Sequence, residues 1–270
     1  MTTTIVTRFL RRTVAGLSIA AALTLLGSAT AYAAPVWERF EPVKALLDGA
    51  TPRTNGIGLD IPLVSEDGSS VPLTVTADSR MRDDDYIEEI HLFATRNPNP
   101  EIASFRLTPH TGLARIATRI RLNETQEVIA VARTNSGEYL VSSREARVTV
   151  NGCLTRADTY DADNIMNARY RVPNELARGE IGEVLTMINH PMETGLREGA
   201  DGEIIPRRLI NRFTATLDDR TVLEARFNTS ISANPYLRFH VRPEEAGTLT
   251  LAWEDETGAA TQEKAPLQVR

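Results

Sequence analysis

Residues 114–122 read Ala-Arg-Ile-Ala-Thr-Arg-Ile-Arg-Leu, in which apolar or small side chains alternate with basic ones. Because successive side chains of a β-strand point to opposite faces, this stretch predicts a strand with one buried face and one wet face. The buried face is expected to carry Ile116, Thr118, Ile120 and Leu122. The wet face is expected to carry a row of three arginines, Arg115, Arg119 and Arg121. Such a strand needs a second sheet to cover its apolar face, and its arginine row could meet an acidic partner.

The same period-two alternation recurs in two groups of short stretches. The first group covers residues 59–63, 71–77, 86–94, 102–107, 127–133 and 147–150. The second group covers residues 170–172, 184–188, 209–217, 222–227, 237–241, 247–253 and 262–269. About seven short strands with frequent turns are typical of a β-sandwich. We therefore predict an all-β protein with two β-sandwich domains in tandem.

The alternation also suggests where the domains begin and end. Residues 36–47 show a short helical pattern that ends at Asp48-Gly49, so the first domain, residues 34–153, is expected to begin with a short helix. Residues 154–167 lose the alternation and are rich in Asp and Asn, which predicts a linker. The second domain is expected to span residues 168–270.

Residues 1–33 have the pattern of a secretory signal peptide. Three arginines are followed by an apolar run from Val14 to Leu26 and by Ala31-Tyr32-Ala33, a small-residue cleavage site before Ala34. The run is too short and too interrupted to span a bilayer, and no later stretch could span one. We expect a periplasmic protein, exported through the general secretory route or, given Arg11-Arg12, the twin-arginine route.

The charge balance bears on possible partners. The whole chain has a formal charge of -6, and removal of residues 1–33 takes away three arginines and no acids, which leaves -9. Binding to a nucleic-acid backbone requires a basic surface. We therefore expect no nucleic-acid partner.

The sequence lacks the common signatures of catalysis. It has no G-x-S-x-G elbow, no nucleotide-binding glycine loop and no H-E-x-x-H motif. The four histidines, His91, His110, His190 and His240, are far apart in the chain, so a metal site would have to be assembled by the fold, with Cys153 joining His110 or His190. The short acidic runs, such as Asp83-Asp84-Asp85 and Glu244-Glu245, are typical of solvated loops. We expect no enzyme activity, no catalytic residue, no metal and no cofactor.

Cys153 is the only cysteine of the chain, so no intramolecular disulfide can form. In an exported protein such a thiol is either buried and inert or free and used. Its polar neighbours favour an exposed thiol at the end of a strand. Arg156 would favour the thiolate, whereas Asp158 and Asp161 would oppose it. A thiolate can hold a cargo as a thioester, a disulfide or a persulfide.

Several longer strings resemble a known pair of proteins. The first set is Tyr-Ile-Glu-Glu-Ile-His-Leu at 86–92, Arg-Asn-Pro-Asn-Pro at 96–100, Thr-Arg-Ile-Arg-Leu at 118–122 and Val-Thr-Val-Asn-Gly-Cys at 148–153. The second set is His-Pro-Met-Glu-Thr-Gly at 190–195, Ile-Asn-Arg-Phe at 210–213 and Ile-Ser-Ala-Asn-Pro-Tyr at 231–236. The first set resembles the sulfur-oxidation protein SoxY, and the second resembles SoxZ. Fused chains of this kind also resemble the SoxYZ-like carriers associated with quinoprotein dehydrogenases.

This resemblance implies two immunoglobulin-like sandwiches that act as a carrier for periplasmic sulfur-oxidation enzymes. It implies that Cys153 holds sulfur intermediates covalently and that Gly152 belongs to the arm that bears the thiol. The only group bound by the protein would then be a sulfur intermediate on Cys153. In the loops at 190–195 and 231–236 the prolines indicate ordinary turns.

The sequence departs from SoxY at the arm. SoxY ends in Gly-Gly-Cys-Gly-Gly, whereas here Asn151-Gly152-Cys153-Leu154-Thr155 keeps one flanking glycine and the chain continues. The terminal arm has become an internal segment, and Leu lacks the backbone freedom of Gly. An alternative function is therefore an accessory binding module of a quinoprotein dehydrogenase system, without covalent sulfur.

Overall fold

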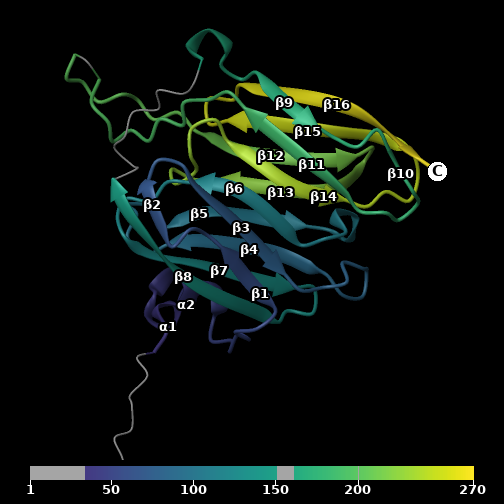
Figure 1. Ribbon diagram of the computed structural model, residues 1–270, viewed down its shortest axis with the longest axis horizontal. Coiled ribbons are helices and arrows are strands. Elements are labelled where there is room, and N and C mark those ends of the chain that lie inside the picture. Colours follow the sequence, from purple (N-terminus) through teal and green to yellow (C-terminus); the bar gives the residue numbers. More distant parts are fainter. Residues whose placement is uncertain (1–33, 151–160, 200) are drawn as a thin grey trace, which may run out of the picture. The chain divides into compact units, whose positions relative to one another are not determined.

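A computed structural model describes residues 34–150, 161–199 and 201–270 (Figure 1). We call residues 34–150 the first half and residues 161–270 the second half. The predicted signal peptide, residues 1–33, lies outside the described residues. Within the described ranges, no helix is long and apolar enough to cross a membrane. Residues 34–270 cluster as one compact unit.

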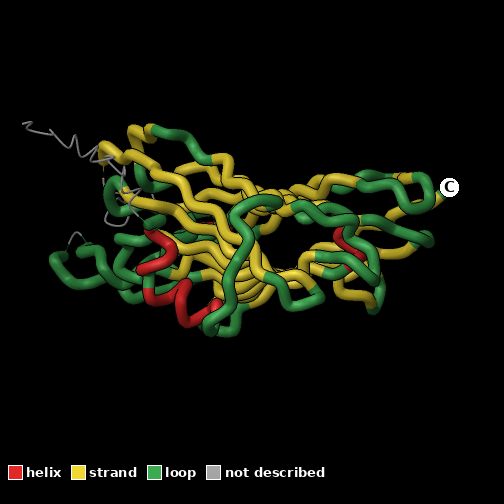
Figure 2. The backbone as a smooth tube through the Cα atoms, turned by 90° about the horizontal axis from the view of Figure 1, so that it is seen from below, coloured by secondary structure: helices red, strands yellow, loops and turns green. Residues whose placement is uncertain are grey.

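The protein is nearly all β, as the alternation predicts, and its helices are short (Figure 2). The first half contains α1 (Val36–Arg39), α2 (Glu41–Leu47), β1 (Ile57–Asp60), β2 (Val64–Asp67), β3 (Val71–Ala77), β4 (Ile87–Ala94), β5 (Glu101–Leu107), β6 (Arg115–Ile120), β7 (Gln126–Thr134) and β8 (Tyr139–Val150). The second half contains β9 (Ala168–Arg171), β10 (Glu175–Leu176), β11 (Gly182–Ile188), β12 (Ile210–Leu217), β13 (Arg220–Phe227), β14 (Tyr236–Val241), β15 (Gly247–Asp255) and β16 (Ala260–Val269). Single 3-10 turns occur at Pro109–Thr111 and Ala162–Asn164.

The helices cover one outer face of the first half. Pro42 lies in the first turn of α2, where the fixed φ of proline is compatible with a helix. The helix ends at Asp48, and both Asp48 and Gly49 have positive φ. The apolar side of α1 and α2 packs on β4, β7 and β8 through a separate apolar cluster. Its members include Trp37, Phe40, Val43, Leu47, Phe93, Ile129, Val131 and Val141.

Both sheets run through both halves (Figure 1). The six-stranded sheet has the order β1-β3-β6-β14-β11-β9, and the ten-stranded sheet has the order β10-β16-β15-β12-β13-β5-β4-β7-β8-β2. We call the two central pairs, β6–β14 and β5–β13, the junction. Outward from the junction, β6, β3 and β1 match β14, β11 and β9, while β5, β4, β7, β8 and β2 match β13, β12, β15, β16 and β10. The outermost pair of the ten-stranded sheet is parallel in each half. The chain therefore has a pseudo-two-fold arrangement of two immunoglobulin-like sandwiches.

The junction is both hydrogen-bonded and apolar. Strand β13 pairs with β5 over five residues, from Leu223 opposite Leu107 to Phe227 opposite Ala103. One buried apolar cluster contains side chains from both halves. In it, the ring of Phe227 lies 6.3 Å from that of Phe105 and 5.9 Å from that of the fully buried Trp253. Because most of the stabilisation of such a core comes from burial of apolar surface, the two halves support each other.

Several details differ from the sequence-based expectations. Strand β1 ends at Asp60, and Leu63 is 55% exposed instead of continuing a buried face. Residues 64–67 form the edge strand β2, which none of the predicted alternating stretches covers. Arg121 is only 4% exposed, whereas Arg115 and Arg119 lie on the wet face as expected. The row of three exposed arginines is therefore wrong at its last position, because Arg121 reaches into the second half. The predicted domain boundaries and the linker 154–167 stay predictions.

The shared core predicts that the two halves stay together when the chain is cut between them. A specific protease site inserted between Ala157 and Asp158, followed by complete cleavage, should leave one species at the size of the intact chain in size-exclusion chromatography. The β5–β13 and β6–β14 pairs and the common core do not depend on that connection. Separation into two species under native conditions would contradict this prediction.

Candidate functional site

Cys153 and Gly152, the predicted attachment site and its arm, lie outside the described residues, and so do Arg156 and Asp158. The structure instead describes the two ends of the chain segment that bears the thiol. That segment, residues 151–160, leaves the first half after Val150 at the end of β8. It joins the second half at Asp161. We call it the thiol-bearing segment.

The first end is held by a buried glycine next to the edge strand β2. The backbone N–H of Gly68 donates to the carbonyl of Val150 at 2.9 Å, and the carbonyl of Gly68 accepts from the N–H of Leu122 at 2.8 Å. A Cβ at position 68 would collide with the carbonyl of Leu122 and would lie 2.7 Å from the carbonyl oxygen of Val150. Only glycine fits, because no side chain can occupy the space between these carbonyls. The end of β8 is thus tied to the end of β6.

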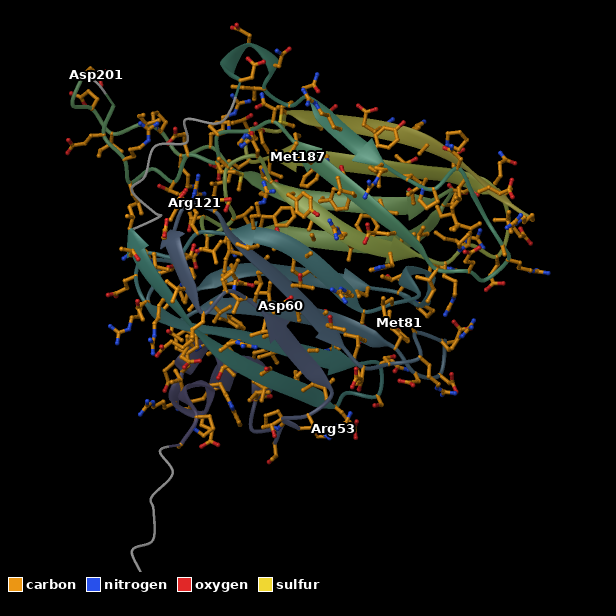
Figure 3. All side chains as sticks on the ribbon, viewed as in Figure 1. Arg53, Asp60, Met81, Arg121, Met187 and Asp201 are labelled. Atoms are coloured by element: carbon orange, nitrogen blue, oxygen red, sulfur yellow. The ribbon has the colours of Figure 1, made fainter. Side chains whose placement is uncertain are left out.

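The second end is held by Asn189, which follows β11. Its side-chain oxygen accepts from the N–H of Asp161 at 2.9 Å, and its amide donates to the carbonyls of Asp161 and Asn164 at 2.6 and 2.7 Å. Asp161 also accepts from Asn164, and this bond together with the N–H of Asp163 lowers the pKa of the Asp161 carboxyl. A polar pocket of about 400 Å³ opens here. Its lining includes Asn164, Asn167, Arg169, Met187, Asn189 and Asn234. Of these, Met187 is labelled in Figure 3.

Arg121 connects the two ends through the junction. Its guanidinium donates to the carbonyls of Met192 and Pro191 at 2.6 and 3.3 Å, only a few residues after Asn189. Its own carbonyl accepts from the amide of Asn97, which also donates to the hydroxyl of Ser230 in the second half. Figure 3 labels Arg121 at this end of β6. The strings at 96–100, 118–122 and 190–195, which carry the family resemblance, therefore meet in one hydrogen-bond network.

The arrangement of Arg121 is repeated by Arg242 with the halves exchanged. Arg242, in the second half, donates to the carbonyls of Met81 and Pro109 in the first half at 2.5 and 2.9 Å. Met81 and Met192 are both fully buried, have φ near +50°, and accept a backbone N–H on sulfur at the start of the next strand. We call these two contacts, Arg121 with Met192 and Arg242 with Met81, the arginine clasps. They follow the pseudo-two-fold arrangement of the strands.

His190 lies at the base of the same network. The ring is fully buried, Nδ1 accepts the N–H of Met192 at 3.1 Å, and Nε2 lies 3.8 Å from a carboxylate oxygen of Asp255, too far for a good hydrogen bond. Burial, followed by the positive charge of Arg208, lowers the pKa of His190 to about 4, although Asp255 opposes the shift. Arg208 donates to the same oxygen of Asp255 at 3.0 Å. His190 is therefore neutral at pH 7. The loop at 190–195 also supplies the two carbonyls that accept from Arg121.

The lowered pKa of His190 predicts acid sensitivity. The unfolded chain takes up the proton near pH 6.5 and the folded chain only near pH 4, so the stabilisation is complete above pH 6.5 and is lost as the pH falls toward 4. We expect a loss on the order of 3 kcal/mol over this window. Urea unfolding of the wild type and of His190→Gln at several pH values tests this, because the variant should lack this part of the slope. Equal slopes would contradict the assignment.

The other predicted candidates do not assemble into a site. In the described residues, no group of His, Cys, Asp and Glu has the geometry to hold a metal ion. His91 lies on β4 beside Glu89 and Glu101, at 3.6 and 3.9 Å. His110 lies in the 3-10 turn after β5, and His240 lies on β14. Asp85 pairs with Arg80 in an exposed turn, as expected of solvated acids. Whether Cys153 approaches His110 or His190 falls outside the described residues.

Sequence reasoning missed Gly68, Asn97 and Asn189. Asp67-Gly68 is a dipeptide that is common in turns. A glycine that a turn requires and a glycine that a steric clash requires look the same in the sequence. Asn97 lies within Arg-Asn-Pro-Asn-Pro and could have been singled out from that string. Asn189 has no local signal, because its partner Asp161 is 28 residues away.

Comparisons with known proteins show which families the chain matches. Residues 43–153 match the model of the family "Sulfur oxidation protein SoxY", and residues 170–266 match the model of "Sulphur oxidation protein SoxZ". No curated protein matches the chain. Among solved structures, the sulfur carrier protein SoxY from Chlorobium limicola f thiosulfatophilum is 25% identical, with 41% of this chain and 94% of that chain covered and a TM-score of 0.34. A superoxide reductase (neelaredoxin) from Ignicoccus hospitalis is 15% identical, with coverage of 35% and 81% and a TM-score of 0.32.

Because both TM-scores are low, the assignment depends on the two family models, which follow one another along the chain. The order of the two matches agrees with the two halves of the fold. The chain is therefore a SoxY–SoxZ fusion, in which a SoxY domain and a SoxZ domain of a sulfur-oxidation carrier form one polypeptide.

Proposed function

We propose that this SoxY–SoxZ fusion is a periplasmic, non-catalytic carrier that holds sulfur intermediates covalently on Cys153 and presents them to enzymes of sulfur-compound oxidation. The observation that carries the proposal is the position of the thiol. The SoxY match ends at residue 153, the only cysteine of the chain, three residues after the end of β8. The described residues on either side are anchored, since Val150 accepts from Gly68 and Asp161 donates to Asn189.

The chemistry of loading follows from the thiol. With thiosulfate as the cargo, the Cys153 thiolate and one thiosulfate dianion form a sulfur–sulfur bond and release two electrons, so the product is a cysteine S-thiosulfonate with one negative charge. A partner enzyme with a two-electron acceptor must take these electrons. A thiol reductant reverses the step, because thiolate exchange breaks the sulfur–sulfur bond and returns the free thiol. The carrier itself needs only a nucleophilic thiol.

Intact mass spectrometry tests the proposal. The protein is purified from its native host, measured before and after treatment with a thiol reductant, and mapped by peptides around Cys153. We expect a sulfur adduct on Cys153 that the reductant removes. A bare thiol in protein taken from cells that are oxidising sulfur compounds would contradict covalent carriage. The same spectrum tests export, because cleavage before Ala34 gives a mature chain that begins at that residue.

A second candidate function is supported by the departure at the arm. Cys153 is followed by Leu154-Thr155 and not by Gly-Gly, so the segment has less backbone freedom than a SoxY tail. In this alternative the chain is an accessory binding module of a quinoprotein dehydrogenase system, and Cys153 has no cargo. Thiol access separates the two. Rapid alkylation of Cys153 in the folded protein supports the carrier, and resistance to alkylation supports the binding module.

A further inference from the structure

The outer face of the six-stranded sheet is basic. Outward residues alternate with buried ones along β3, β6, β11 and β14, and the strand register places outward residues of β1 and β9 beside them. The charged outward residues are Asp60, Arg115, Arg119, Arg169, Arg171, Glu183 and Arg238. We call this surface the arginine face. Five arginines and two acids give it a net charge of +3, whereas the whole chain has a formal charge of -6.

The arginine face is built by both halves and lies open. Arg115 and Arg119 come from the first half, and the other three arginines come from the second half. All five are exposed or half-buried. The two helices pack on the ten-stranded sheet, and in Figure 1 the strands of the six-stranded sheet lie side by side, away from α1 and α2. The complete face therefore exists only while the two halves are joined.

Most of the positive charge on this face is not neutralised within the protein. Glu183 lies 3.7 Å from both Arg171 and Arg238, so two arginines share one carboxylate. Among the described residues, the other three arginines have no carboxylate within 4.0 Å. Their guanidinium groups are therefore available to carboxylates from outside the chain.

Like charges also meet across the junction. Arg238 of β14 lies directly opposite Ala117 of β6. Arg115 and Arg119 lie two residues to either side of Ala117, so they are diagonal neighbours of Arg238, at about 7 Å. Positive charges this close on neighbouring strands repel one another and do not stabilise a sheet. The stability of the fold therefore does not explain this arrangement.

The outer face of the ten-stranded sheet has the balanced pattern expected of a solvated surface. One row across β7, β4, β5 and β13, in which each residue lies directly opposite the next, reads Arg133, Glu89, Arg106 and Glu224. Glu89 lies 3.2 Å from Arg133 and 3.4 Å from Arg106. Opposite charges on neighbouring strands stabilise a sheet. Because the same chain balances the charges of one sheet and leaves the other basic, exposure to water alone does not account for the arginine face.

An aromatic ring at the junction holds arginines of both halves. The guanidinium of Arg119 lies over the ring of Tyr236, 5.2 Å from its centroid, and Nε of Arg238 donates to the hydroxyl of Tyr236 at 2.9 Å. Met187 lies directly opposite Tyr236 on the next strand. Arginine, tyrosine and methionine are enriched in protein–protein interfaces. The planar guanidinium can bind a carboxylate through two parallel hydrogen bonds.

We propose that the arginine face is a docking surface for an acidic partner protein, whose carboxylates pair with Arg115, Arg119 and Arg238 at the junction. Complementary charge of this kind speeds association and selects the partner. Because the face needs both halves, the partner recognises the joined SoxY and SoxZ domains and neither domain alone. The proposal goes beyond sulfur carriage, uses no residue of the thiol-bearing segment and does not depend on a cargo.

An anionic lipid surface fits the arginine face less well than an acidic protein. Binding to a membrane surface gains from buried apolar area as well as from charge. Among the described residues, none of the exposed large apolar side chains belongs to the outward residues of this sheet. Tyr170 of β9 is exposed, but its hydroxyl reaches the carbonyl of Lys264 in the other sheet.

Binding of poly-L-glutamate tests the face with a defined acidic polypeptide. Its affinity is measured by fluorescence anisotropy at low ionic strength for the full chain and for two triple variants that each lose three positive charges. The first variant combines Arg115→Gln, Arg119→Gln and Arg238→Gln. The matched control combines Arg106→Gln, Arg212→Gln and Arg226→Gln, which alters exposed arginines of the ten-stranded sheet. We expect about tenfold weaker binding in the first variant and less than about twofold weaker binding in the control.

Three results would overturn the proposal, provided that urea unfolding shows both triple variants to be folded. One is an equal loss of affinity in the two variants, and another is no binding by the unaltered chain. The third is sedimentation with phosphatidylglycerol vesicles that requires the arginines of the first variant, without binding of poly-L-glutamate. That result would identify a lipid surface as the occupant.

Photo-crosslinking keeps the test sharp if the first triple variant does not fold. In the native host, p-benzoylphenylalanine replaces Ala117 at the centre of the arginine face or, as the control, Thr214 on the outer face of the ten-stranded sheet, directly opposite Glu224. We expect protein adducts at position 117 whose cross-linked peptides are rich in Asp and Glu, and none of these adducts at position 214. The same adducts at both positions, peptides without clustered acids or no adduct at position 117 would contradict the proposal. Neither measurement needs a sulfur cargo, so failure here is distinct from a bare thiol in the mass spectrum.

Discussion

Replacing Cys153 with serine is expected to abolish sulfur loading completely. A serine hydroxyl is not ionised at neutral pH and cannot form a sulfur–sulfur bond, and the chain has no second cysteine to take over. The measurement is intact mass after incubation with thiosulfate and an extract of periplasmic proteins from the native host. The wild type should gain a mass that a thiol reductant removes, and Cys153→Ser should gain none. The unfolding midpoint in urea should be the same in both, because the described apolar core forms without position 153.

A matched variant tests whether position matters as well as chemistry. Cys153→Ser combined with Thr155→Cys restores one thiol two residues farther along the segment. If a partner enzyme recognises the thiol at position 153, the displaced thiol should load more slowly than the wild type, although its chemistry is the same. An adduct that persists in Cys153→Ser alone would show that the sulfur is held elsewhere and without a cysteine. That result would contradict covalent carriage.

The strands could be predicted from the sequence because their signal is local. In residues 114–122 the alternation of side chains fixes which residues are buried, and Ile116, Thr118, Ile120 and Leu122 are buried. The edge strand β2 could not be predicted from such an alternation. Its sequence, Val-Ser-Glu-Asp, is short and polar, and it is ordered by parallel pairing with β8, more than 80 residues away. Long-range pairing of this kind leaves no trace in a local pattern.

Arg121 shows where local periodicity fails. Its place in the alternation matches that of Arg119, yet it is buried because the loop after β11 supplies carbonyls to its guanidinium. The pseudo-two-fold arrangement was equally hidden. Met81 and Met192 occupy equivalent places, and both have a φ near +50°. Methionine is not a residue type that predicts a positive φ. The two halves share strand order and clasp geometry without sharing a sequence motif.

The arginine clasps predict the largest effect on stability. In Arg121→Met the methionine roughly keeps the buried volume but leaves the carbonyls of Met192 and Pro191 without their donor. An unsatisfied buried carbonyl costs about 1–3 kcal/mol, and removal of a desolvated guanidinium offsets part of this. We expect a loss of about 3 kcal/mol in the free energy of unfolding, measured by urea unfolding at pH 7. Arg115→Met is the control, because Arg115 is exposed on β6, the strand that Arg121 follows, and it should change the stability by less than about 0.5 kcal/mol.

The pseudo-two-fold arrangement extends the prediction to Arg242. Arg242→Met should cost about as much as Arg121→Met, since each guanidinium bonds two carbonyls of the other half, one of them a methionine with positive φ. Arg121 follows β6 and Arg242 follows β14, and these strands are antiparallel, so the clasps lie at opposite ends of the junction. Distant sites are additive within about 0.5 kcal/mol, so the double variant should lose the sum of the two effects. If either single variant lowers the free energy of unfolding no more than Arg115→Met does, the arginine clasps do not stabilise the junction. The shared apolar core alone would then hold the halves together.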